Sequence, residues 1–206
     1  RCMTQMVLLA FPGVVISTFF LGIPIHYLFP YDWDWKISFL LGGLLSATDP
    51  VAVVSLLKEL GASKKLNTII EGESLMNDGT AIVVYRLFFQ MVAGRTFNAA
   101  EVIQFLSKVA FGAVALGLAF GIVSFWWLGV IFNDTVIEIT LTLTVSYIAY
   151  FTAEGAIEVS GVLTVMTLGI FYAAVAKMAM KGESQKSLHH FWEMVAYIAN
   201  TMIFIL

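Results

Sequence analysis

The sequence has 206 residues, of which 60% are hydrophobic and only 12% are charged, and its formal net charge is −3. Soluble domains carry about 25% charged residues, so this composition indicates a membrane protein, and the small net charge gives no sign of nucleic acid as a partner. The single cysteine, Cys2, excludes a disulfide within the chain.

Apolar segments recur along the whole chain, and seven of them are long enough to be transmembrane helices. We expect these spans at residues 3–29, 36–57, 66–91, 99–131, 136–153, 159–177 and 188–206. The predicted fold is therefore all-α, with one polytopic transmembrane domain over residues 1–206. Because the sequence begins at Arg1 and stops within the apolar run TMIFIL, we expect it to be a piece of a longer protein.

Basic residues predict the orientation of these spans. If the first end is cytoplasmic, most basic residues lie on the cytoplasmic side, namely Arg1, Lys58, Lys64, Lys65, Lys177, Lys181 and Lys186. The positive-inside rule favours this orientation. Tyr31, Trp33 and Trp35 are then expected at the outer membrane interface, and Trp126 and Trp127 near the inner one, where aromatic rings partition.

The second segment contains the tripeptide Thr48, Asp49 and Pro50 near its middle. Proline has no amide hydrogen and its ring clashes with the preceding turn, so we expect the helix to break here and leave carbonyl groups unpaired. Broken backbone at membrane depth is tolerated where it lines a cavity or is packed in protein. Carbonyl, hydroxyl and carboxylate oxygens together suit a hard cation such as sodium.

The third segment contains EGESLMNDGT, residues 71–80. Ser74 and Asp78 are four residues apart and therefore share one helix face, while Glu73 and Asn77 form a second such pair beside them. The first pair offers a hydroxyl and a carboxylate to an ion, and the second pair can hold those ligands in place. Glu71 is nearest the cytoplasmic end, where we expect it to be solvated.

Asp49 and Asp78 both fall near the middle of their predicted spans. A charge at that depth costs about 3 kcal/mol on insertion scales, so a deep carboxylate indicates an ion or proton site that faces the protein interior. The alternative is a buried structural pair with Lys or Arg, but no basic residue of the chain lies comparably deep beside them.

The fourth segment has more than thirty residues, which at 1.5 Å each reach about 50 Å across a hydrocarbon core of about 30 Å, so it must tilt or protrude. Gly117 and Gly121 in this segment favour the close approach of a neighbouring helix over a specific dimer contact.

Other polar residues have weaker functional signals. For Glu138, Glu193 and His26 we expect positions at the membrane interface or structural hydrogen bonds rather than ion binding. A role in pH sensing is an open alternative for His189 and His190, because histidine titrates near neutrality.

The stretch TDPVAVVSLLKELGASKKLNTIIEGESLMNDGTAIVVY resembles the monovalent cation/proton antiporter family, which shares both motifs in this order and at about this spacing. The stretches FNDTVIEITLTLTVSYIAYFTAE, SGVLTVMTLG and QKSLHHFWEMVAYIANTMIFIL also resemble it, and the plant plasma-membrane sodium/proton antiporters of the salt-overly-sensitive type are the most similar branch. The resemblance implies an inverted-repeat fold of about 13 helices, of which this chain is the middle.

The resemblance also implies a homodimer in which a core domain moves against a scaffold, with the fourth segment as the linker helix between them. It implies sodium ions and protons as substrates, a lipid bilayer as surroundings, and neither a cofactor nor enzymatic activity. The residues matching the family's cation and proton ligands are Thr48, Asp49, Ser74 and Asp78, and the supporting residues are Pro50, Glu73 and Asn77. In the family, an arginine on a later helix steadies the supporting glutamate and asparagine.

The predicted function is exchange of sodium for protons by alternating access, and the resemblance implies an electroneutral exchange because Asn77 replaces a second aspartate. Exchange of potassium, or of several cations, for protons is the alternative. A cation channel could use the same ligands. An intramembrane aspartyl protease is disfavoured, because Tyr31 and Asp32 lie in a loop and Asp78 precedes a glycine instead of following one.

Overall fold

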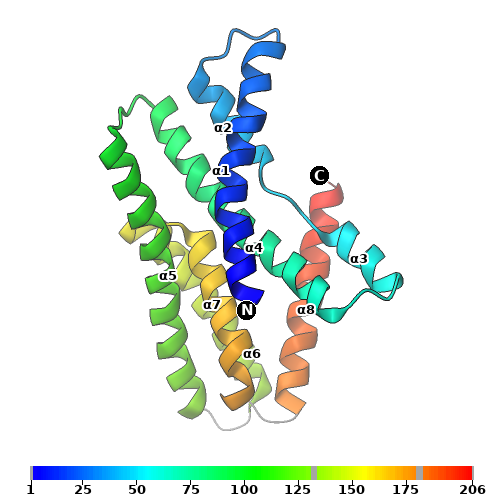
Figure 1. Cartoon of the computed structure of the whole chain (residues 1–206). Coiled ribbons are helices and arrows are strands. Elements are labelled where there is room, and N and C mark those ends of the chain that lie inside the picture. The colour runs from blue at the N-terminus through cyan, green and yellow to red at the C-terminus, as the bar shows by residue number, and fades with distance from the viewer. Residues whose placement is uncertain (1, 131–133, 180–182, 206) are drawn as a thin grey trace. The chain divides into compact units, whose positions relative to one another are not determined.

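The computed structural model describes residues 2–130, 134–179 and 183–205, which form helices and no β-strand (Figure 1). The predicted all-α fold is thus confirmed. The chain divides into two compact units, Arg1–Gly112 and Ala113–Leu206, and the boundary falls within one long helix. That both units belong to a single transmembrane domain stays a prediction.

The first unit contains α1 (Cys2–Leu28), α2 (Trp35–Leu45), α3 (Val51–Glu59), α4 (Lys64–Val92) and the start of α5 (Ala99–Val130). Helix α1 packs against α2 and α4, α2 also packs against α4, and α3 contacts α4. A small core of Val14, Ala81 and Val84 joins α1 to α4, with Phe88 packed against it. Helix α4 thus contacts the three helices α1, α2 and α3 of this unit.

Helices α1 and α2 approach each other very closely. A methyl group added at Gly42 would lie 2.6 Å from the Thr18 carbonyl oxygen, so only glycine fits at this point of the interface. The connection between the two helices is aromatic, as predicted for a membrane interface: His26 Nδ1 donates a hydrogen bond to the Trp33 carbonyl oxygen (2.9 Å), and the His26 ring stacks on Trp35.

The second unit contains the rest of α5, then α6 (Thr135–Phe151), the π-helix η1 (Thr152–Ile157), α7 (Gly161–Ala179) and α8 (Glu183–Ile205). Helix α6 packs against α7 and α8, and its Val145 and Ala149 form a core with Leu168 of α7. Helix α5 has 32 residues, which confirms the predicted long helix.

The two glycines of α5 lie against α7. A methyl group at Gly117 would lie 2.5 Å from the Thr164 carbonyl oxygen, and one at Gly121 would lie 2.6 Å from the Phe171 ring. The expectation that these glycines allow a neighbouring helix to approach is confirmed, and α7 is that neighbour.

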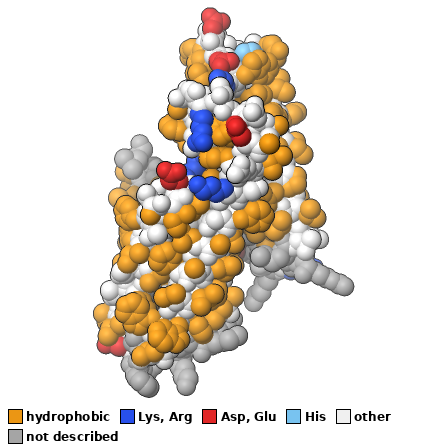
Figure 2. All heavy atoms as spheres, turned by 90° about the vertical axis from the view of Figure 1, so that its left-hand side faces the viewer, with side chains coloured by type: hydrophobic (Ala, Val, Ile, Leu, Met, Phe, Trp, Pro, Cys, Tyr) orange, Lys and Arg blue, Asp and Glu red, His pale blue; other side chains and the backbone are white. Residues whose placement is uncertain are grey.

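Within the described residues, three helices are long and apolar enough to cross a membrane: Thr4–Leu28, Ala99–Val130 and Thr135–Ile157. Trp35–Leu45 and Gly161–Val175 are apolar but shorter. Helix α4 has 29 residues, a sufficient length, but it carries the charged residues of the third predicted segment. Hydrophobic side chains cover most of the face shown in Figure 2, as expected for helices that contact lipid.

A first prediction concerns Gly42. Gly42→Ala should lower the unfolding free energy of the whole protein by about 1–3 kcal/mol, because its methyl group meets backbone that cannot rotate away. Thermal unfolding in detergent measures this. Gly13→Ala in α1 is the matched control, since no atom lies within 4 Å of the added methyl group. Equal melting temperatures for the two variants would show that α1 and α2 are not closely packed at Gly42.

Candidate ion-binding site

The predicted break lies between α2 and α3. Helix α2 ends at Leu45, α3 begins at Val51, and residues 46–50 between them, here called the break segment, are not helical. Pro50 closes this segment, because it cannot donate a backbone hydrogen bond into the preceding turn. The single span predicted at 36–57 is thus two helices, and their pairing as halves of one transmembrane helix stays a prediction.

Two side chains of α4 bind Thr48 of the break segment. The Ser74 hydroxyl donates a hydrogen bond to the Thr48 carbonyl oxygen. The Asn77 side-chain amide donates a second hydrogen bond to the Thr48 hydroxyl oxygen at 3.0 Å. Ser74 and Asn77 are both buried. Residues that lie 26 and 29 positions apart in the sequence are therefore in direct contact, and the two predicted motifs meet in space.

Asp78 lies one turn beyond Ser74 on α4, and the charges of Asp49 and Glu73 are close enough to act on its carboxylate. The side chains of Asp49 and Asp78 are exposed. The break segment covers Ser74 and Asn77, while Asp78 lies at the edge of this contact. That both carboxylates face the interior of the membrane protein stays a prediction.

Of the predicted supporting pair, Asn77 contacts the break segment directly. Among the described residues no hydrogen bond joins Glu73 to Asn77; the Asn77 amide instead binds Thr48 directly. The other end of that amide, Oδ1, is buried and has no hydrogen-bond partner among the described residues. Asn77 is thus a direct support of the break segment, with one acceptor still open.

Ser46 is a supporting residue that was not among the predicted site residues. Its hydroxyl donates a 3.2 Å hydrogen bond to the Val14 carbonyl oxygen of α1, and its side chain is only 4% exposed. Thr18 donates to the same carbonyl oxygen at 2.8 Å. Ser46 therefore ties the start of the break segment to α1, as Asn77 and Ser74 tie its middle to α4. The sequence signal that could have identified Ser46 was its position two residues before Thr48, where the helix is interrupted.

The remaining predicted residues lie elsewhere. His189 and His190 are exposed on α8 and contact Glu193 at 3.2 Å and 3.4 Å, so these three side chains form a local cluster. Glu138 is buried on α6, and its Oε2 has no hydrogen-bond partner in the part of the chain that the structure describes. The structural hydrogen bond expected for Glu138 is thus not found at this oxygen.

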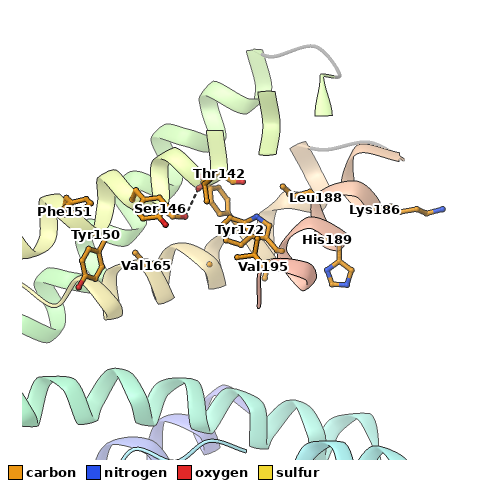
Figure 3. Close-up of a pocket in the computed structure, with 15 residues that line it drawn as sticks. Thr142, Ser146, Tyr150, Phe151, Val165, Tyr172, Lys186, Leu188, His189 and Val195 are labelled. Atoms are coloured by element: carbon orange, nitrogen blue, oxygen red, sulfur yellow. Dashed lines mark hydrogen bonds between the residues drawn. The ribbon is translucent and has the colours of Figure 1, made fainter. Parts of the chain in front are cut away.

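A cavity of about 1000 Å³ lies in the second unit, between α6, α7 and α8 (Figure 3). Its lining is mostly apolar, with Ser146 bonded to the Thr142 carbonyl oxygen at 2.8 Å and Tyr172 bonded to Ser124 at 2.7 Å. None of the predicted cation ligands lines it. The cavity is therefore a feature distinct from the candidate ion-binding site of the first unit.

The chain matches the transmembrane sodium/hydrogen exchanger family over residues 1–206. It is similar to two proteins of Arabidopsis thaliana over its whole length: sodium/hydrogen exchanger 7 (72% identical, covering 18% of that protein) and sodium/hydrogen exchanger 8 (65% identical, covering 27%). It is also 38% identical over 200 residues to the low-affinity Na(+)/H(+) antiporter NhaS1 of Synechocystis sp., covering 94% of this chain and 36% of that relative. The chain thus spans 18% to 36% of the length of these three relatives.

A second prediction tests the contact between the break segment and α4. Thr48→Val should lower the unfolding free energy by about 1–3 kcal/mol, because it leaves the buried Asn77 amide without its acceptor. Thr140→Val is the control, since Thr140 is exposed and bonds only within its own helix. Thermal unfolding of the whole protein compares the two. If Thr48→Val is no less stable than Thr140→Val, the bond to Asn77 contributes nothing.

Proposed function

This chain belongs to the sodium/hydrogen exchanger family, and from that membership we propose that it exchanges sodium ions for protons across a membrane by alternating access. The observation that carries this proposal is the pair of hydrogen bonds from Ser74 and Asn77 to Thr48. They bring the oxygen-rich break segment to the acidic part of α4, which is the arrangement that a site for a dehydrated cation requires.

The proposed cation ligands are oxygen atoms of Thr48, Asp49, Ser74 and Asp78. The hydrogen bonds described above leave these oxygens usable, because Ser74 donates its proton to Thr48 and keeps both lone pairs on its own oxygen. The Thr48 hydroxyl oxygen accepts one hydrogen bond from Asn77 and keeps a second lone pair. The two carboxylates supply the negative charge that a sodium ion needs once its hydration shell is partly removed.

Coupling follows from competition for the Asp78 carboxylate. With Asp49 and Glu73 nearby, an empty and ionised Asp78 experiences repulsion that either a sodium ion or a proton relieves. When the site holds a sodium ion or a proton, the protein can change between the two access states. When the site is empty, it cannot. Asn77 is neutral, and in this proposal Asp78 is the carboxylate that exchanges its proton, so one proton moves for each sodium ion and the exchange is electroneutral.

The remaining parts of the proposal rest on family membership and helix composition. The relatives are named as transporters, and we assign this chain no enzymatic activity and no cofactor. The apolar helices place it in a membrane as a multi-pass protein. The plasma membrane as its location, sodium in preference to potassium, and a homodimeric state are proposals drawn from the resemblance to plant antiporters.

A third prediction concerns Asp78 as the residue that binds either the sodium ion or the proton. Asp78→Asn should abolish sodium-driven proton movement, because an amide neither takes up the proton nor neutralises the cation. The measurement is the internal pH of proteoliposomes that contain the whole protein, after a sodium gradient is imposed and the membrane potential is clamped. Asp32→Asn, which changes an exposed loop aspartate in the same way, is the matched control and should retain the parent rate. Substantial exchange by a folded Asp78→Asn variant would remove Asp78 from the carrier role.

A fourth prediction concerns pH. If protons and sodium compete for one carboxylate, lowering the pH on the side from which sodium binds should raise the apparent binding constant (KM) for sodium. The rise should be about tenfold per pH unit once the free site is mostly protonated, and the maximal rate should change little. Initial rates against sodium concentration at several pH values measure this. The double variant His189→Gln with His190→Gln should keep the same response, because these residues are exposed and pair with Glu193. Loss of the response in that variant would assign pH control to α8 instead.

A further inference from the structure

Ser46 uses its hydroxyl group differently from other helical hydroxyls of the first unit. Serine and threonine hydroxyls in helices ordinarily donate to a carbonyl group three or four residues earlier in the same helix. Thr18, Ser38 and Thr80 do so. Ser46 lies at the end of α2, but its hydroxyl donates to the Val14 carbonyl oxygen of α1, 32 positions earlier in the sequence. The hydrogen bond therefore joins two helices instead of stabilising one.

The surroundings of this hydrogen bond are buried. The side chains of Ser46, Val14 and Thr18 are all buried. The Val14 carbonyl oxygen already accepts the Thr18 hydroxyl at 2.8 Å, so it would still have a partner if Ser46 were removed. The bond from Ser46 therefore adds an attachment of the break segment to α1, and water cannot readily replace it at a buried position.

The break segment is thereby held from two sides. Of its five residues, 46–50, all of which the structure describes, Ser46 alone is buried. Two residues further along, Ser74 and Asn77 of α4 donate hydrogen bonds to Thr48. The Thr48 oxygens therefore lie close to one attachment to α1 and at another to α4, and loss of the attachment to α1 leaves the segment free to shift at its start.

We propose that Ser46 is a positioning residue for the cation site: its bond to α1 fixes the Thr48 oxygens at the spacing that favours sodium over the larger potassium ion. This inference rests on the proposed function, in that Thr48 and Asp78 are its cation ligands. Selectivity between cations of equal charge depends on the size of the site and on the flexibility of its ligands. Supporting hydrogen bonds must hold such ligands to within about 0.5 Å. Ser46 acts through Thr48 and does not itself bind the ion.

Calorimetric titration of the whole protein in detergent, with sodium chloride and with potassium chloride, tests this proposal. Ser46→Ala should raise the dissociation constant (Kd) for sodium by about threefold or more, because the ligands are held less firmly. The Kd for potassium should change less, so the ratio of the potassium Kd to the sodium Kd should fall by about twofold or more.

Ser38→Ala is the matched control. Ser38 is also buried on α2 and also donates to a backbone carbonyl oxygen, but that carbonyl belongs to Asp34 at the start of the same helix. Ser38→Ala should therefore keep the parent ratio of Kd values. A merely structural role of Ser46 would lower the melting temperature of Ser46→Ala and leave that ratio unchanged.

A second pair of variants covers the case in which Ser46→Ala does not fold. Ser46→Thr and Ser46→Val add the same bulk, but threonine retains a hydroxyl group, so Ser46→Thr should keep a higher ratio of Kd values than Ser46→Val. The proposal is overturned if folded Ser46→Ala keeps the parent ratio, if Ser38→Ala lowers the ratio equally, or if the threonine and valine variants have the same ratio.

The same titrations separate this inference from the proposed function. A parent protein that binds sodium but moves no protons in response to a sodium gradient would contradict the proposed function, while the comparison of Kd values would still test the role of Ser46. A parent protein that binds neither cation would overturn both.

Discussion

The fold of the first unit depends on one constraint: backbone that leaves a helix at membrane depth must find its hydrogen bonds elsewhere. Pro50 imposes the interruption, and the polar atoms of Thr48 are then bonded by two side chains from α4. Ser46 adds a bond to the backbone of α1. The close packing of α1 on α2 at Gly42 fixes where the break segment begins. The same bonds that satisfy the interrupted backbone therefore bring together the oxygens proposed to bind a cation.

The charges of the site follow from this geometry. Ser74 and Asn77 are neutral and buried where they hold Thr48, whereas Asp49 and Asp78 lie at the exposed edge of the contact. A carboxylate at an edge can be reached by hydrated ions and can still be enclosed when the protein changes state. Asn77 Oδ1 is buried without a hydrogen-bond partner among the described residues, so one acceptor stays open inside this contact.

The sequence predicted the helices well, since apolar segments of membrane length are a strong signal, and it predicted the meeting of the two motifs. It could not predict which atoms meet. Helix periodicity placed Glu73 and Asn77 side by side as supporting residues, and the structure adds that the Asn77 amide binds the Thr48 hydroxyl oxygen. The role of Ser46 depends on a tertiary contact and on burial, which no pattern within a single segment reports.

The central claim, that one carboxylate carries either sodium or a proton, is tested most directly by counting the protons released when sodium binds. Calorimetric titration of the whole protein with sodium, in buffers that differ in ionisation enthalpy, gives this number. The account predicts a value that approaches one proton per sodium ion at a pH low enough to protonate the free site, and that falls toward zero as the pH rises. Sodium binding without proton release at every pH would contradict it.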